Sequence, residues 1–165
     1  MANILDVAKY IKEFYKQISN QDIDEMKLQK LLYFCQREYL ALMNKPLFNE
    51  DMEGWVFGPV SPIVHENFAI RFIFAGDSSN LTSDEKTIIR NVVYQYGSIE
   101  SWKLSQISHN EISWINSRKG LQKYDRGNVI LKIEDIKKDS EKIKPFDQLW
   151  GMYFEDFYDK EVELV

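Results

Sequence analysis

The residues of this chain that are capable of nucleophilic or acid–base chemistry are few and lie far apart. The chain has two histidines, His65 and His109, and one cysteine, Cys35. A catalytic cysteine and histidine are neighbours in the folded chain and not in the sequence. Their spacing along the chain therefore neither supports nor rules out such a pair. Cys35 falls on the apolar side of a helical pattern, where a neutral thiol packs as a small hydrophobic group. We therefore expect Cys35 to be structural, and a hydrolase that uses Cys35, or His109 with Glu111, is the minority interpretation.

The sequence indicates neither a metal site nor a phosphate-binding loop. The histidines show no metal-binding spacing, and one cysteine supports neither a cysteine-based zinc site nor a disulfide framework. Gly54 and Gly58 precede neither a third glycine nor the Lys-Ser/Thr pair of a phosphate loop. His109 follows Ser108 at a predicted helix start, where the helix dipole disfavours the imidazolium. We expect a neutral His109 that holds the turn through Glu111 or a backbone carbonyl, with partner contact as the alternative. The prediction is no catalytic residue, no cofactor and no metal.

Composition and charge exclude several classes of protein. The chain has 165 residues, 44% apolar and 28% charged, which is typical of one globular domain, here spanning 1–165. Its net charge of -5 predicts no direct nucleic-acid binding, which draws on a basic surface. No run of ~18 apolar residues predicts a membrane span, and residues 1–10 show no signal-peptide pattern. A single cysteine favours a reducing compartment, so we expect a cytoplasmic protein.

The charge is concentrated in the C-terminal segment 145–165. This segment contains six acidic residues and one lysine, so it carries the whole net charge of -5, and it is also rich in aromatic residues. We predict a last helix here. Its aromatic side chains either dock on the core while the acids face solvent, or face a basic partner. The candidates for partner contact in this segment are Trp150, Tyr153, Phe157 and Tyr158.

Apolar residues at helical spacing predict two long helices near the N terminus, over 4–19 and 25–43. Asp22 and Glu25 form the expected capping pair of the second helix. A helix with one apolar stripe buries one face against its neighbour, so we expect the two helices to pack together. The stripe of the second helix is Leu28, Leu31, Leu32, Cys35, Tyr39 and Leu42.

Shorter elements follow. Apolar runs at 55–57 and 129–131 predict two strands that pair with each other. Helices are predicted from Ser61 as N-cap over 62–75, from the capping patterns at 82–85, 98 and 108–111, and from Ile133 onward. The fold class is therefore mostly α (α+β): a single compact helical domain of about seven or eight helices with a small two- or three-stranded antiparallel sheet.

Several motifs occur in an order that resembles a known family. Residues 28–36 read L-Q-K-L-L-Y-F-C-Q, residues 55–62 read W-V-F-G-P-V-S-P, and residues 108–114 read S-H-N-E-I-S-W. Over roughly 24–137 the chain resembles the Panacea domain, also described as the SocA-like or phage-associated GepA family. The chain departs from the family at His65, where Tyr is common, and at Gly54, where Ala often precedes the tryptophan.

The resemblance implies a small, mainly helical antitoxin that binds and silences a toxin encoded next door, often in a prophage. Alternatives are a proteolysis adaptor that hands its partner to a protease, and a phage regulator that binds a host protein. No enzyme activity or cofactor is implied.

Most motif residues are expected to be framework, with Trp55 and Trp114 in the core and Gly58–Pro59 fixing a strand-to-helix turn. Gln29 and Lys30 are polar within an apolar helix, so they either brace a turn or contact the partner. The framework residues are Leu28, Leu31, Tyr33, Trp55, Gly58, Pro59, Val60, His109, Glu111 and Trp114.

Overall fold

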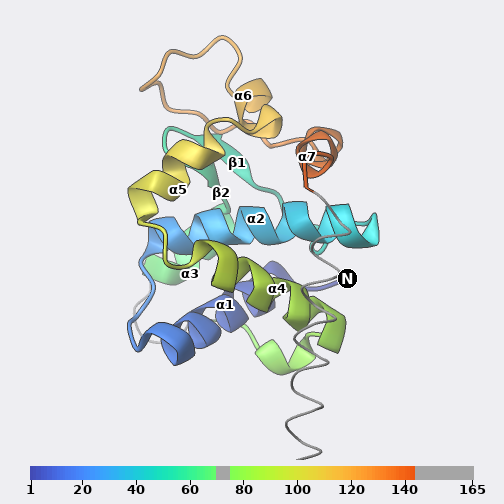
Figure 1. The fold of residues 1–165 in the computed structure, drawn as a ribbon. Coiled ribbons are helices and arrows are strands. Elements are labelled where there is room, and N and C mark those ends of the chain that lie inside the picture. The colour runs from blue at the N-terminus through green and yellow to red at the C-terminus, as the bar shows by residue number, and fades with distance from the viewer. Residues whose placement is uncertain (70–74, 144–165) are drawn as a thin grey trace, which may run out of the picture.

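Helices dominate the structure, a computed structural model that describes residues 1–69 and 75–143. One two-stranded antiparallel sheet accompanies them, which confirms the predicted mostly α fold (Figure 1). In chain order the elements are α1 (Ile4–Ser19), α2 (Glu25–Met43), β1 (Glu53–Trp55), β2 (Gly58–Val60), α3 (Pro62–Ala69), the 3₁₀ turn η1 (Ser78–Asn80), α4 (Ser83–Tyr96), α5 (Ser101–Ser108), α6 (Ile112–Ser117) and α7 (Ile133–Ser140). The predicted last helix over 145–165 lies outside the described residues.

The first two helices begin and end at the predicted residues because local signals define both ends. Asp24, rather than the predicted Asp22, caps α2: its carboxylate accepts a hydrogen bond of 2.8 Å from the backbone of Lys27. Both helices end at an asparagine in the left-handed conformation, Asn20 with φ 57° and Asn44 with φ 56°. Asparagine tolerates this conformation better than most residues, so it stops a helix in place of glycine.

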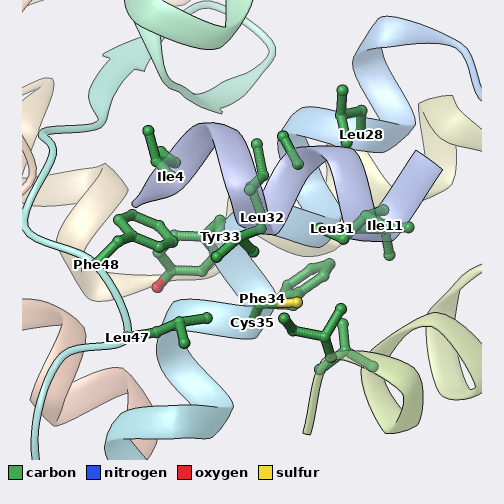
Figure 2. Packing of buried hydrophobic residues seen from close by; sticks show 14 of the residues in the cluster. Ile4, Ile11, Leu28, Leu31, Leu32, Tyr33, Phe34, Cys35, Leu47 and Phe48 are labelled. Carbon is green, nitrogen blue, oxygen red and sulfur yellow. The ribbon is translucent and has the colours of Figure 1, made fainter. Parts of the chain in front are cut away.

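Helix α2 crosses the centre of the molecule, with α1 and α4 on one side and α5, α6, α7 and the sheet on the other (Figure 1). Every side chain from Lys27 to Leu40 is buried. The prediction that α2 buries only one face is therefore wrong, since neighbours cover it on both sides. Figure 2 shows part of the resulting core, where side chains of α1, α2 and the loop at Leu47 and Phe48 pack together.

The region after α2 folds as a hairpin rather than as one strand followed by a turn. Glu53 pairs with Val60 and Trp55 pairs with Gly58, so Val56 and Phe57 form the turn that was predicted to be strand. Correspondingly, the predicted turn residues Gly58 and Pro59 belong to β2. The sequence does not show this, because the pairing partner of β1 contains a glycine and a proline, both poor strand formers.

The second predicted strand, at 129–131, forms a single bridge in which Ile130 lies opposite Glu53. The backbone of Gly54 donates to Val129 at 2.9 Å, and that of Leu131 donates to Met52 at 2.8 Å. The predicted pairing with 55–57 is thus shifted toward the start of β1.

In the second half of the chain, one of the predicted helix caps is confirmed and two are wrong. The capping box of Thr82 and Glu85 at the start of α4 is confirmed, with bonds of 2.8 and 3.2 Å in both directions. The predicted caps Ser98 and Ser108 are wrong: α5 starts after Glu100 and α6 starts after Glu111, neither with a side-chain cap of its own. Ser108 ends α5 instead.

Candidate partner-binding site

Gln29 and Lys30, two polar residues of the α2 motif, hold the end of the hairpin. Gln29 binds both backbone groups of Ser61, accepting from its nitrogen at 2.8 Å and donating to its oxygen at 3.1 Å. Lys30 donates to the carbonyl oxygen of Pro59 at 3.0 Å. Both side chains are buried, with 2% and 1% of their surface exposed. Gln29 and Lys30 therefore hold β2 and the residue that joins it to α3, rather than a turn within the hairpin, while contact with a partner stays a prediction.

Gly58 lies where the hairpin, α2 and α5 meet. Its φ of +119° is one that L side chains rarely adopt. A Cβ atom there would lie 2.4 Å from Oγ of Ser108 and 2.7 Å from Cε of Lys30. Only glycine satisfies both the backbone conformation and the packing. Its neighbours Pro59 and Val60 are buried as well.

Aromatic motif residues connect the hairpin to α6. The indole nitrogen of Trp114 donates to the carbonyl oxygen of Trp55 at 2.8 Å, and His109 stacks on Trp114 with ring centroids 4.2 Å apart. Both tryptophans are only half-buried, so the prediction of core positions is wrong.

His109 follows the last residue of α5 instead of lying at a helix N terminus. Burial lowers its pKa, and the nearby charges of Lys30 and Arg118 lower it further. The imidazole is therefore neutral at pH 7 as expected, but for a different physical reason.

A buried polar cluster joins α2, α6 and α7. The hydroxyl of Tyr33 lies 3.0 Å from Glu111 and 2.8 Å from Asp139. Glu111 also accepts hydrogen bonds from Arg37 at 2.7 Å and Lys142 at 2.6 Å. Glu111 was predicted to bind His109, but it binds Tyr33, Arg37 and Lys142 instead. Sequence analysis missed Asp139, Arg37 and Lys142, because their contacts with Tyr33 and Glu111 span long stretches of the chain and leave no local pattern.

A surface cavity of about 700 Å³ opens on the outer side of this framework, between the first half of α2, the hairpin, α3 and residues 126–128. Its volume is within the range of protein sites that enclose a ligand. The cavity is lined by Glu25, Met26, Gln29, Lys30, Glu53, Trp55, Val56, Phe57, Val60, His65, Arg126, Gly127 and Asn128.

The two carboxylates that line the cavity are already bound within the chain. Glu25 is hydrogen-bonded to Nδ1 of His65, and Glu53 accepts from the indole nitrogen of Trp55 at 2.8 Å. The rings of Trp55 and His65 meet edge to face at 5.1 Å. Burial lowers the pKa of Lys30 to about 7, a shift that the negative charge of Glu25 partly opposes.

The remaining candidate nucleophile, Cys35, packs in the core. Cys35 is fully buried, and burial raises the pKa of its thiol well above the usual value. Within residues 1–69 and 75–143, no group of three or more His, Cys, Asp and Glu side chains is arranged to hold a metal ion. The same residues contain no helix that is long and apolar enough to cross a bilayer. The tail candidates Trp150, Tyr153, Phe157 and Tyr158 lie outside the described residues.

Fold and site together define a small helical domain whose motif residues form one interlocked framework beside a partly apolar cavity. A family model described as "Antitoxin SocA-like, Panacea domain" matches residues 28–115, slightly more than half of the chain. The chain therefore belongs to the SocA-like Panacea family of antitoxins, which confirms the resemblance seen in its motifs. The matched region runs from α2 to α6 and contains the framework, whereas Arg126 and α7 lie outside it.

A curated relative is Antitoxin SocA from Caulobacter vibrioides (strain NA1000 / CB15N). The two are 45% identical over 47 residues, which is 28% of this chain and 25% of the relative. The match thus spans about a quarter of the relative's length. No solved structure matches the chain significantly. Membership of an antitoxin family implies a protein partner in general and suggests a non-enzymatic role.

Proposed function

We propose that this chain is an antitoxin that neutralises a toxin, encoded by the neighbouring gene, by direct contact between the two proteins. The observation that carries this proposal is the family match over residues 28–115. The framework adds support, since Gln29, Lys30 and Gly58 hold the hairpin against α2 and so pre-form the adjoining surface. A pre-formed surface loses less conformational entropy on binding.

The residues considered for a hydrolase serve packing in the described structure. Cys35 lies inside the core, where its thiol has no access to a substrate. His109 is stacked on Trp114, and Glu111 is bound to Tyr33, Arg37 and Lys142. These contacts favour protein binding over catalysis as the proposed activity.

Co-expression with the neighbouring gene tests the proposal. The neighbour alone should stop growth, and the chain should restore growth and co-purify with the neighbour's product. A neighbour that is harmless alone would contradict the proposal and favour the regulator that binds a host protein. Rescue that disappears in a host lacking its ATP-dependent proteases would favour the proteolysis adaptor over neutralisation by contact.

The acidic, aromatic segment 145–165 is a second proposed contact. Its net charge of -5 would speed encounter with a basic toxin, because opposite charges steer association. Replacing Trp150 and Phe157 by Ala in the full chain should weaken co-purification with the toxin. Unchanged toxin binding would remove this segment from the interface.

A further inference from the structure

The cavity beside the framework has apolar walls and an exposed aromatic rim. Trp55, Val56, Phe57 and Val60 of the hairpin supply most of the apolar lining. Phe57 lies at the hairpin tip with 57% of its surface exposed. Such walls favour an apolar side chain over water, since removing apolar surface from water is favourable.

Helix α5 packs against the hairpin tip. The hydroxyl of Ser105 donates to the carbonyl oxygen of Phe57 at 2.6 Å, which fixes the hairpin tip against this helix. Trp102 lies one turn earlier on the same face of α5 and is 54% exposed. An exposed aromatic side chain at a cavity, as Phe57 is, is typical of the anchors that dominate binding energy at protein interfaces.

The inner wall of the cavity contains a buried amine with spare hydrogen-bonding capacity. Lys30 is 1% exposed and makes one hydrogen bond, to Pro59. A lysine ammonium group can donate three hydrogen bonds. Within the described part of the chain no carboxylate lies within salt-bridge distance of Lys30, and nearby Glu25 is bonded to His65. The removal of the amine from water is therefore only partly compensated.

The hydrogen-bond donors beside the cavity favour a ligand that carries a carboxylate. The carboxylates of Glu25 and Glu53 are engaged by His65 and Trp55. The two basic side chains, Lys30 and Arg126, form no ion pair with any described residue. Arg126 is exposed, so it can approach a ligand at the mouth while Lys30 lies at the inner wall. A carboxylate held between them would accept hydrogen bonds from both side chains.

From this combination of apolar walls and unpaired basic side chains, we propose that the cavity binds a segment of the toxin in which an apolar side chain lies next to a carboxylate. The apolar side chain fills the space lined by Trp55 and Phe57, and the carboxylate pairs with Lys30. This inference rests on the proposed antitoxin function and adds the surface and the partner chemistry to it.

The first test compares two buried lysines of α2. Lys30→Met keeps most of the side-chain volume but removes the charge, and it should weaken toxin binding by about tenfold or more. Lys27→Met is the matched control, because Lys27 is also buried and donates to a backbone carbonyl, that of Gly97 at 2.7 Å, but does not line the cavity. It should change the dissociation constant by less than about threefold. Circular dichroism and thermal melting check that both variants fold.

A second pair of variants needs no buried substitution. Phe57→Glu places a negative charge at the cavity rim and should abolish growth rescue. Tyr94→Glu is the control: Tyr94 is 55% exposed on α4, which lies across α2 from the hairpin, so rescue should persist (Figure 1). This pair keeps the inference falsifiable even if Lys30→Met fails to fold.

A small probe tests the carboxylate itself. Phenylbutyrate should displace the toxin from the full-length chain at concentrations of about 10 mM, whereas phenylbutyramide should not. Equal displacement by both compounds would overturn the role of the charge. A further outcome is that the free chain binds phenylbutyrate only after Trp150 and Phe157 are replaced by Ala. That result would show that the chain's own tail occupies the cavity, and it would also overturn the inference.

The outcomes separate the two proposals. If the unsubstituted chain neither rescues growth nor co-purifies with the neighbour's product, the antitoxin proposal fails and the cavity inference fails with it. If the unsubstituted chain does both, but Lys30→Met and Phe57→Glu bind the toxin as their controls do, only the cavity inference fails.

Discussion

The carboxylate of Asp139 on α7 accepts two hydrogen bonds from Ser113 on α6, one from the backbone nitrogen at 3.0 Å and one from the hydroxyl at 2.6 Å. It also accepts from the backbone nitrogen of Ile112 at 2.6 Å. The first turn of α6 is therefore capped by a residue that lies 26 positions further along the chain. This contact ties α7, outside the family match, to a helix inside it.

Replacing Asp139 by Ala should lower the free energy of unfolding by about 3 kcal/mol, because several buried donors lose their acceptor. Urea denaturation measures this loss. Glu134→Ala is the control on the same helix; Glu134 is exposed, so its effect should stay within about 0.5 kcal/mol. Equal effects of the two substitutions would mean that the Asp139 contacts contribute nothing specific.

Two glycines with positive φ should differ in their response to alanine. At Gly58 the new Cβ meets Ser108 and Lys30, so we expect a loss of more than about 2 kcal/mol in the free energy of unfolding. Gly120 has φ +85°, and apart from its two chain neighbours no described residue lies within 4 Å of the position that an alanine Cβ would occupy, so Gly120→Ala should cost about 1 kcal/mol from backbone strain alone. Chemical denaturation of both variants tests this order, and a smaller loss for Gly58→Ala would contradict it.

Lys30 should make stability depend on pH. Burial lowers its pKa in the folded chain to about 7, against 10.5 for the free side chain. Below about pH 7 both states hold the proton, and between about pH 7 and 10 only the unfolded state does. Stability of the unsubstituted chain relative to Lys30→Met should therefore rise with pH across this window, by about 1 kcal/mol per unit.

Unfolding titrations of both proteins at several pH values measure this difference, and the comparison cancels contributions from other titrating groups. A difference that stays constant with pH would contradict the lowered pKa. The titratable or charged groups around Lys30 that both proteins share are Glu25 on α2, Glu53 on β1, His65 on α3, His109 after α5, and Arg126.

Cys35 should be unreactive in the folded chain. A thiol reacts as its thiolate, and burial both raises the pKa of Cys35 and shields the sulfur. We expect a disulfide reagent to modify the native chain at least about 100-fold more slowly than the chain in denaturant. Rapid modification of the native chain would contradict this and reopen the hydrolase interpretation.

The sequence by itself determined the elements whose signals lie within a few residues. Helices α1 and α2 were predicted with the observed bounds, and the capping box of Thr82 and Glu85 gave the start of α4. These signals work because a cap and the turn that it stabilises are neighbours in the chain. The ordered motifs also sufficed to recognise the antitoxin family.

Only the tertiary structure decided which polar residues are buried and what they hold. Gln29 and Lys30 meet their partners about 30 positions away, and Tyr33 meets Asp139 across 106. Such contacts depend on packing around α2, so no local pattern indicates them. The local pattern at Ser108 predicted a helix cap, but α5 packs against the hairpin and Ser108 is its last residue. A distant carboxylate, that of Asp139, caps α6 instead.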